Sequence, residues 1–581
     1  MLSRVFRRIT MIQAITFFTT VVSMLVDSII IGSNLGVVCV AAYGLAAPLL
    51  TLFAAVGGTF QVGCQTLTSN AIGVGDTKKA NQALSVTFFI ALIVSLVGTA
   101  VIFLCATPLA KALGAGSSPE LLENTVGYLR GYVLGAPGLI LVLILLPVMQ
   151  LDSDNNRTIA AAGALTIVDI VFDLMNVYVF HGGMFGMGLA SALSVYAGLI
   201  ILLLHFTKKK NIFHLSFRGL DLKLVGPVMN TGFPYALGSL CRTFLVFTLN
   251  RILLGVSGQD SVAAFSVVNT LFSVMSIPGS AVSEATLMLS SIMAGEKNKK
   301  GLFETLKLFI TQGAVINIIV AVIFFIAAPF LVPIFVKEGS AHIISMAVTG
   351  TRIVAFSMIL ACIDGSFRNY YQGIGRMGLT RLMCVLTTYV ALVVPALILT
   401  PFLGETGVWI SYILADVIVL CLLFFLAWRN CGHRPASFED LSFLPKNFGP
   451  ADEDLKEYSL ASIDDVMAAS VEISDFCKNK GADLRTRMVA SLAVEELGSN
   501  VIQHAMHAGK NDHFEVRIIH ERGSFIIRMR DDCKAFNPKD YVALYQKEDP
   551  TESLGIRMIV GTAHDVQYMN TLSLNNLIIK V

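Results

Sequence analysis

The stretch VDSIIIG, residues 26–32, has a counterpart in LNRILLG, residues 249–255. In this pair Asn250 takes the place of Asp27, at an offset of 223 residues. Further pairs follow at nearly the same offset: VAAYGLAAPLL from residue 40 resembles VAAFSVVNTLF from residue 262, and GVGDTKKA from residue 73 resembles MAGEKNKKG from residue 293. Chance does not keep an offset so constant. The sequence therefore predicts two copies of one structural unit.

Each copy consists mainly of long apolar runs. Hydrophobic residues make up 55% of the 581 residues and charged residues only 14%. Because a membrane-spanning helix needs about 20 apolar residues, the runs predict twelve spans, near 9–32, 40–72, 84–107, 126–150, 158–180, 184–206, 229–255, 262–292, 305–332, 343–371, 379–401 and 406–428. The predicted fold is an all-α membrane protein with two six-helix lobes, residues 1–210 and 211–430, in a lipid bilayer.

Lysine and arginine gather in alternate joints between the runs, as at Arg7, Lys78, Lys208, Lys299 and Arg429. Because such residues stay on the cytoplasmic side, both termini are predicted to be cytoplasmic, in a multi-pass protein of the cell (inner) membrane. Six spans per copy is an even number, so both lobes have the same orientation. In folds of this kind the substrate binds between the lobes, and rocking of the lobes gives alternating access.

Charged residues become frequent after about residue 435, which predicts a second domain. Residues 431–450 lack periodicity and are interpreted as a linker. In residues 451–581 the pattern predicts an edge strand, helices at 463–479 and 482–506, strands at 513–520 and 524–531, a loop, a helix at 553–563 and two final strands. Stretches such as FEVRIIH and SFIIRMR alternate apolar and polar residues, as strands do. We expect an α/β sandwich with helices on one face of a mostly antiparallel sheet.

Several function classes are disfavoured by what the sequence lacks. The ten cysteines are scattered without a CxxC pair, which does not fit a disulfide framework or a zinc site. No GxxxxGK[ST] motif occurs, so a pump of the ABC type is disfavoured. Nothing indicates a nucleic-acid partner, and small molecules and lipid are the expected partners of the spans.

Three acids in the first lobe are the main candidates for a functional site: Asp27, Asp169 and Asp173. An acid at the centre of a bilayer costs about 2.5–3.5 kcal/mol, so its presence needs a reason. Asp169 and Asp173 are one helical turn apart and share a face. Because two ionised carboxylates there would repel each other, this pair favours protons over sodium as the bound ion.

The second lobe also contains acids within its predicted spans, at Glu284, Asp364 and Asp416. A site and a structural role are both open for Glu284 and for Asp364, which lies four residues before Arg368. Asp416 is expected to be structural. Since Asn250 replaces Asp27, coupling to an ion is expected to be concentrated in the first lobe.

In this order, and within a duplicated chain, several stretches resemble the MATE (multidrug and toxic compound extrusion) transporters. They are VDSIIIGSNLG from residue 26, SNAIGVGDTKKA from residue 69, YYQGIGR from residue 370 and ETGVWISYILAD from residue 405. The resemblance covers about residues 10–430. It implies secondary export of amphipathic, often cationic compounds in exchange for protons or sodium, through a cavity between the lobes.

The resemblance also implies which residues bind the coupling cation. In that family an Asp in the first span and an N-x-x-x-D pair in the fifth take part. The matching residues are Asp27 and, in IVDIVFDLMN, Asp169 and Asp173. Asp169 stands where the family has Asn, which is a departure from its pattern.

The C-terminal domain resembles the GHKL ATPase superfamily and, within it, the anti-sigma-factor serine kinases. In AVEELGSNVIQHA, residues 493–505, Glu496 and Asn500 match the motif E-x-x-x-N, with His504 on the same helical face. In MRDDCKAFNP, Asp531 matches the Asp that binds the adenine amino group, and in ESLGIRMI, Gly555 matches a glycine of the phosphate-binding turn. The resemblance implies ATP and magnesium as cofactors of this domain, with Glu496 as catalytic base, Asn500 as magnesium ligand, and Asp531 and Gly555 as nucleotide-binding residues.

Three positions depart from that pattern, since Cys533, Glu552 and Ser553 stand where glycines are expected. Side chains in a phosphate-binding turn keep backbone N–H groups away from the phosphates. The domain could therefore bind nucleotide with weak or no turnover, act as a kinase or ATPase, or bind only a protein. A solvated helix face explains Glu496 and Asn500 without any of these roles.

Two hypotheses for the whole chain follow. The first is a cation-coupled multidrug antiporter whose transport is tuned by a cytoplasmic nucleotide-sensing domain. The second is a membrane sensor, in which the spans bind a ligand and the tail phosphorylates or sequesters a cytoplasmic regulatory protein.

Overall fold

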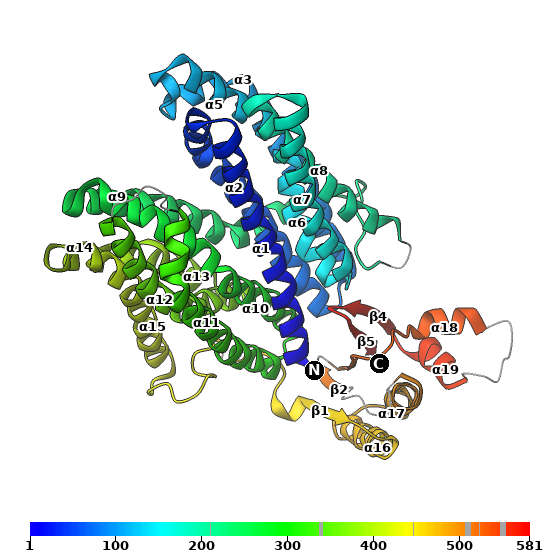
Figure 1. The fold of residues 1–581 in the computed structure, drawn as a ribbon. Helices are drawn as coiled ribbons and strands as arrows, with labels where there is room; N and C mark the ends of the chain where they lie inside the picture. The colour runs from blue at the N-terminus through cyan, green and yellow to red at the C-terminus, as the bar shows by residue number, and fades with distance from the viewer. Residues whose placement is uncertain (209–210, 336–340, 446, 506–512, 522, 546–553) are drawn as a thin grey trace.

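The computed structural model describes residues 1–581 apart from 209–210, 336–340, 446, 506–512, 522 and 546–553. Two helical lobes carry a C-terminal sheet domain at one end (Figure 1). The first lobe contains α1 (Leu2–Asn34), α2 (Val37–Val74), α3 (Thr77–Leu104), α4 (Ala106–Ala112), α5 (Pro119–Val133), α6 (Ala136–Leu151), α7 (Asn155–Met175) and α8 (Gly183–Leu203). The second contains α9 (Val225–Met275), α10 (Ile277–Gly295), α11 (Lys299–Phe335), α12 (Ala341–Gly373), α13 (Met377–Val385), α14 (Ala391–Leu403) and α15 (Glu405–Cys431).

Most of the predicted spans coincide with long apolar helices. In the described part of the chain, ten helices are long and apolar enough to cross a membrane, and α5 with α6 forms a further pair bent by 44°. The 51-residue α9 contains Gly258 in a non-helical conformation with φ 70°, which glycine adopts without a steric penalty. Because the helix is interrupted there, α9 holds one complete span and the first part of another, which α10 continues. By length and composition alone the described helices give ten spans, or eleven with the bent pair, and the break at Gly258 lies between the predicted spans 229–255 and 262–292.

The two lobes meet at the end that carries the sheet domain. α2 packs against α9 and α10 of the other lobe, and α1 packs against α10. Glycines allow the backbones to touch: a Cβ added to Gly63 would lie 2.2 Å from the carbonyl oxygen of Val228, and one added to Gly232 would lie 2.0 Å from that of Thr59. Toward the opposite end the helices of the two lobes diverge (Figure 1). The structure is therefore closed at the domain-bearing end.

We expect Gly232→Ala to loosen this closed end, because the added methyl group meets backbone and must push α2 away. Hydrogen exchange of the full chain in lipid nanodiscs should show faster deuterium uptake in residues 59–73 of α2. Gly226→Ala is the matched control on the same helix, since its added Cβ meets no described atom within 4 Å. Equal uptake in the two variants would contradict a tight backbone contact between the lobes.

The C-terminal domain is a five-stranded sheet with helices on one face. The strand order is β1-β2-β3-β5-β4, and every neighbouring pair is antiparallel. The elements are β1 (Leu455–Leu460), α16 (Ile463–Asn479), α17 (Leu484–Asn500), β2 (Phe514–Glu521), β3 (Ser524–Asp531), α18 (Pro538–Tyr545), α19 (Leu554–Thr562), β4 (Asp565–Thr571) and β5 (Leu574–Lys580). The predicted fold class, helical membrane lobes with an α/β sandwich, is confirmed.

One predicted loop is wrong in part, because α18 forms between β3 and α19. Asn537 accepts a hydrogen bond from the backbone N–H of Lys539 at 3.1 Å, and Pro538 occupies the first helical position, where its missing N–H costs nothing. The local sequence thus starts a short helix that apolar periodicity alone does not reveal.

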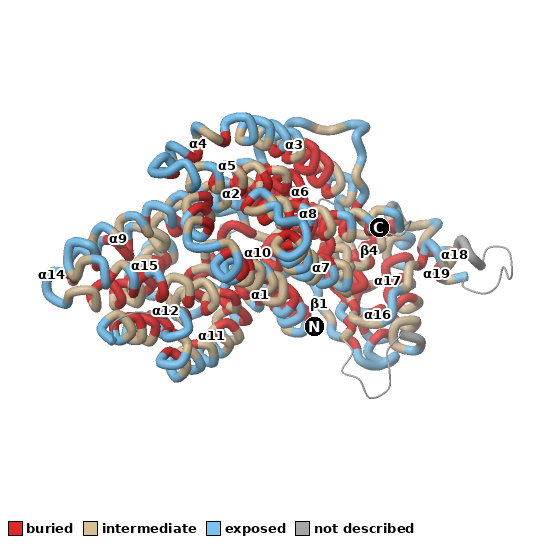
Figure 2. Tube along the Cα trace, turned by 45° about the horizontal axis from the view of Figure 1, so that its top comes forward, coloured by how far each residue is buried: buried red, intermediate tan, exposed pale blue. Residues whose placement is uncertain are grey.

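The two faces of the sheet have different partners. Val516, Ile527 and Ile579 lie in the domain's own core together with α16 and α17. Leu574 and Ile578, in contrast, belong to the hydrophobic cluster of the membrane lobes. Figure 2 shows buried residues both in the lobes and in the C-terminal domain. The domain is therefore packed onto the lobes through its sheet.

Candidate functional site

The three acids singled out in the first lobe lie together. Asp27 is in α1, and Asp169 and Asp173 lie on one face of α7, which packs against α1. Carboxylate oxygens of the three residues lie within 4.8 Å of one another, and all three residues are buried. Two helices far apart in sequence thus build one acidic cluster.

α7 changes its winding directly after Asp173. The α-helix gives way at Asn176 to a π-helical turn, Asn176–Phe180. The side chain of Asn176 accepts a hydrogen bond from the N–H of Gly182 at 3.1 Å and donates one to the carbonyl oxygen of Gly183 at 3.0 Å. Such turns occur frequently at functional sites, and this one locks the end of the helix that carries two of the acids.

Most of the carboxylate oxygens of the cluster have no hydrogen-bond partner, although serines, among them Ser191 and Ser194, bond to Asp169. Of the six carboxylate oxygens, Oδ1 of Asp27, Oδ1 of Asp169 and both of Asp173 are buried with no hydrogen-bond partner in the described structure. A buried charge without a partner is strongly unfavourable, and three carboxylates this close repel one another. Protons or a small cation would relieve both effects, and carboxylate oxygens are suitable ligands for hard cations.

Tyrosines that sequence reasoning missed border the cluster. The ring of Tyr43 contacts that of Tyr128 edge-on at 5.3 Å, and Tyr128 stacks on Tyr132 at 6.0 Å. Tyr43 and Tyr132 are close enough to interact electrostatically with Asp27 and Asp169. Aromatic faces attract organic cations. In the sequence these tyrosines look like ordinary packing residues of apolar runs, so nothing there distinguishes them.

The acids of the second lobe lie beside an arginine. Asp364 and Asp416 line one cavity of about 170 Å³ together with Arg368. Glu284 lines another cavity, to which Arg368 also contributes. A cluster of three acids close enough to hold a cation is found only in the first lobe, as far as the described residues extend.

The C-terminal domain contains a pocket of about 600 Å³ at the predicted nucleotide site. Glu496 and Asn500 line it from α17, and Asp531 lines it from the end of β3. Its other walls are mainly apolar and aromatic, with Val501, Met529, Phe536, Tyr541, Ile556, Tyr568 and Leu577. A polar floor between apolar walls suits a flat heterocyclic base.

Asp531 is held in a defined position on the pocket floor. Asn575 donates a hydrogen bond to its Oδ1 at 2.7 Å, and the backbone N–H of Cys533 donates another at 3.0 Å. Burial raises the pKa of Asp531, although the bonds from Asn575 and Cys533 oppose that rise. Since Cys533 acts through its backbone, the absence of glycine there does not remove this contact. The role of Asn575 had no signal in the sequence.

Gly555 lies at the start of α19 against Glu496. A Cβ added to Gly555 would lie 2.3 Å from Cδ of Glu496, so a side chain here would displace the Glu496 carboxylate from its present position. Glu552 and Ser553 lie outside the described residues, as does the rest of 546–553. The described side chains fit the base end of a nucleotide.

The duplicated lobes with their buried acids define a membrane transporter, to which a C-terminal sheet domain is fused. The family model MatE matches residues 13–175 and 234–398, once in each lobe and together over more than half of the chain. The chain belongs to the MatE family. A model described as histidine kinase-like ATPase domain matches residues 460–580, which is nearly the whole C-terminal domain.

Relatives with curated names are similar to the transporter part. The multidrug export protein MepA of Staphylococcus saprophyticus is 24% identical over 384 residues, which cover 65% of this chain and 83% of that protein. MepA of Staphylococcus aureus is 23% identical over 391 residues, covering 66% and 84%.

Solved structures show the same fold. A MATE in complex with MaL6 superimposes with a TM-score of 0.70 at 21% identity, over 74% of this chain and 96% of that chain. A MOP superfamily transporter from Pyrococcus furiosus gives a TM-score of 0.69 at 21% identity over the same shares. At this identity the likeness concerns the fold of the lobes.

Proposed function

We propose that the chain is an antiporter that exports amphipathic, often cationic small molecules by alternating access, with protons or sodium as the coupling ion. The buried cluster of Asp27, Asp169 and Asp173 carries this proposal, because its unpartnered oxygens need a proton or cation. The names of the MepA relatives, multidrug export proteins, support the substrate class.

The position of α1 offers a route from ion binding to movement of the lobes. α1 packs against α7 within its own lobe and against α10 of the other lobe. When the cluster gains or loses a cation, the repulsion between Asp27 and the two acids of α7 changes. That change acts on the helix that contacts both lobes, which is what coupling of ion exchange to alternating access requires.

We also propose an inner-membrane location with both termini in the cytoplasm, supported by the placement of lysine and arginine. The lobes would then comprise residues 1–210 and 211–430, followed by a linker, 431–450, and a cytoplasmic domain, 451–581. In this orientation the closed end of the lobes faces the cytoplasm.

The C-terminal domain is proposed to sense a nucleotide and to regulate transport, alone or with a cytoplasmic protein. Asp531 would bind the base, Asn500 a magnesium ion and Gly555 the phosphate side, with Glu496 as base if turnover occurs. A bound ATP would supply the phosphoryl group for any such turnover. The pocket between apolar walls, with Asp531 fixed on its floor, supports the binding part of this proposal.

Transport by the purified full chain in liposomes tests the proposal. An imposed proton or sodium gradient should drive accumulation of a fluorescent organic cation, and collapse of that gradient by an ionophore should abolish it. No accumulation with either gradient would contradict the antiporter. If phosphorylation of a partner protein then depended on Glu496, the membrane-sensor alternative would be favoured.

A further inference from the structure

The outer face of the sheet carries three arginines toward the membrane lobes. Arg517 of β2 is paired in register with Arg528 of β3, and Arg530 follows two residues later on the same face. This face is opposite to the one that covers α16 and α17, because side chains alternate along a strand. Arg517 and Arg528 are only 7% and 8% exposed. Buried arginines need acidic or carbonyl partners, and the lobes supply them.

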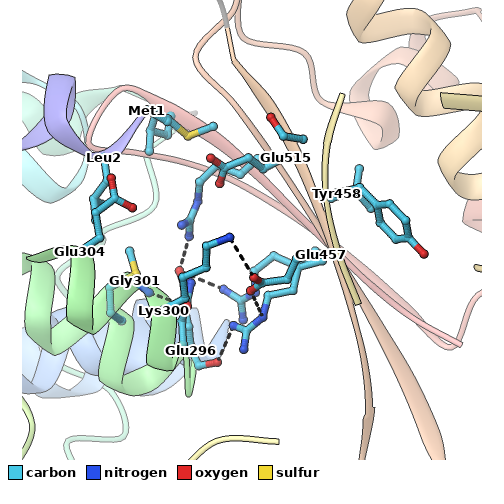
Figure 3. A pocket seen from close by; sticks show the side chains of 17 residues that line it. Met1, Leu2, Glu296, Lys300, Gly301, Glu304, Glu457, Tyr458 and Glu515 are labelled. Carbon is cyan, nitrogen blue, oxygen red and sulfur yellow. Dashed lines mark hydrogen bonds and ion pairs between the residues drawn. The ribbon is translucent and has the colours of Figure 1, made fainter. Parts of the chain in front are cut away.

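Glu296, at the end of α10 in the second lobe, is the shared partner. Nη1 of Arg528 lies 3.3 Å from its Oε1, Arg530 donates to the same oxygen, and Arg517 donates to its backbone carbonyl at 3.4 Å. Burial alone would raise the pKa of Glu296, but the positive charges of Arg530, Arg528 and Arg517 outweigh it and hold that pKa below its ordinary value. Figure 3 shows Glu296 beneath the sheet, beside a cavity of about 160 Å³ that Lys300 and Glu457 also line.

Arg528 also contacts the first lobe. Its Nη2 donates a hydrogen bond to the carbonyl oxygen of Gly73 at 2.9 Å. Gly73, in the last turn of α2, is in close contact with the other lobe, since a Cβ there would lie 2.2 Å from the carbonyl oxygen of Ile292. A single guanidinium thus bonds both lobes at the joints 73–80 and 293–301, which the sequence repeat relates to each other.

The domain makes further contacts with the first lobe. Arg4 of α1 forms an ion pair with Asp532, which follows β3. Ser153, between α6 and α7, donates to the carbonyl oxygen of Asn570 at 2.9 Å and accepts from the N–H of Ser573 at 2.8 Å. The chain itself joins the domain to the second lobe through residues 432–454. The domain is therefore continuous in the chain with the second lobe, and it is held to the first lobe only by non-covalent contacts.

We propose that the C-terminal domain is a latch that holds the two lobes closed at their domain-bearing end, through the bridge Gly73–Arg528–Glu296 and the contacts at Arg4 and Ser153. This inference rests on the proposed alternating access, in which the lobes must separate at that end. Separation breaks the contacts with the first lobe and removes one partner from the buried Arg528, which is strongly unfavourable. The docked domain thus favours the state in which the cytoplasmic side is shut, and transport requires its release.

Hydrogen exchange of the full chain in nanodiscs tests the latch without any transport measurement. Arg528→Ala should increase deuterium uptake severalfold in residues 59–73 of α2 and 226–235 of α9, where the lobes touch. Glu296→Ala removes the partner of Arg528 in the second lobe and changes no residue of the sheet. It should give the same increase in deuterium uptake. Lys300→Ala is the matched control: it removes the 3.5 Å ion pair with Glu457 between the domain and the second lobe but leaves the bridge through Arg528 in place, so uptake should stay at the wild-type level.

The outcomes separate the latch from the proposed function. Unchanged uptake in both Arg528→Ala and Glu296→Ala would overturn the latch, even if gradient-driven transport is observed. If Arg528→Ala also raises exchange in β2 and β5, its domain has unfolded, and Glu296→Ala alone decides. Failure of gradient-driven transport together with increased uptake in these variants would overturn the antiporter and leave the latch standing. Gly232→Ala is the positive control: increased deuterium uptake in this variant shows that hydrogen exchange detects loosening of the contact between the lobes.

Discussion

Asp27→Asn should reduce gradient-driven accumulation in proteoliposomes to the level of protein-free liposomes. Asparagine has nearly the same shape, but it neither takes up a proton nor carries the charge that a cation requires. In the proposed coupling site the carboxylates of Asp27, Asp169 and Asp173 would act on one ion, since their oxygens lie within 4.8 Å of one another. Asp173→Asn should therefore cause the same loss, and the double variant should be no worse than either single one.

Asp260→Asn is the matched control for this series. Asp260 is an exposed acid of α9, so the same chemical change is made outside the cluster, and accumulation should be unaffected. All variants are compared at equal amounts of reconstituted protein, with a proton gradient and with a sodium gradient. If Asp27→Asn accumulates substrate at the wild-type rate under the gradient that drives the wild type, the cluster is not the coupling site.

Asp531→Ala should weaken nucleotide binding by the full-length protein about tenfold to a hundredfold. A hydrogen bond to a charged group contributes about 1.5–3 kcal/mol, and each 1.4 kcal/mol is about a factor of ten in affinity. The loss should be close to the upper part of this range, because Asp531 is buried and is already oriented by Asn575. Titration with a fluorescent ATP analogue, with and without magnesium, measures it.

Asp475→Ala serves as the control in that titration. Asp475 is exposed on α16, on the outer side of the same domain, and its loss removes an equal charge at a distance from the pocket. Binding that is equally tight in Asp531→Ala, Asp475→Ala and the wild type would rule out Asp531 as the residue that recognises the base. No binding in any of the three would leave the domain as a protein-binding module.

Much of the fold follows from patterns of short range. The lengths of the apolar runs predict the spans, because the thickness of the bilayer sets the length of a helix that crosses it. The repeat around Asp27 and Asn250 predicts two similar lobes. In the C-terminal domain, the alternation in FEVRIIH and SFIIRMR predicts β2 and β3, since each strand must bury one face. The spacing of Asp169 and Asp173 places them on one helical face without reference to any other helix.

What escaped prediction depends on contacts between distant segments. Alternation shows that Arg517, Arg528 and Arg530 share a face, but polar residues on a strand usually face water, and nothing local indicates that a membrane lobe covers them. The partnership of Asn575 with Asp531 depends on the register between β3 and β5, which neither strand encodes alone. The short helix α18 escaped because its capping residues, rather than its apolar periodicity, start it.

Arg530, Asp531 and Asp532 are consecutive, yet their side chains go to three destinations: Glu296 of one lobe, the pocket floor, and Arg4 of the other lobe. A ligand that displaced this strand end by a fraction of an ångström would disturb both anchorages at once. Occupancy of the pocket and the closure of the two lobes would then be linked through three consecutive residues.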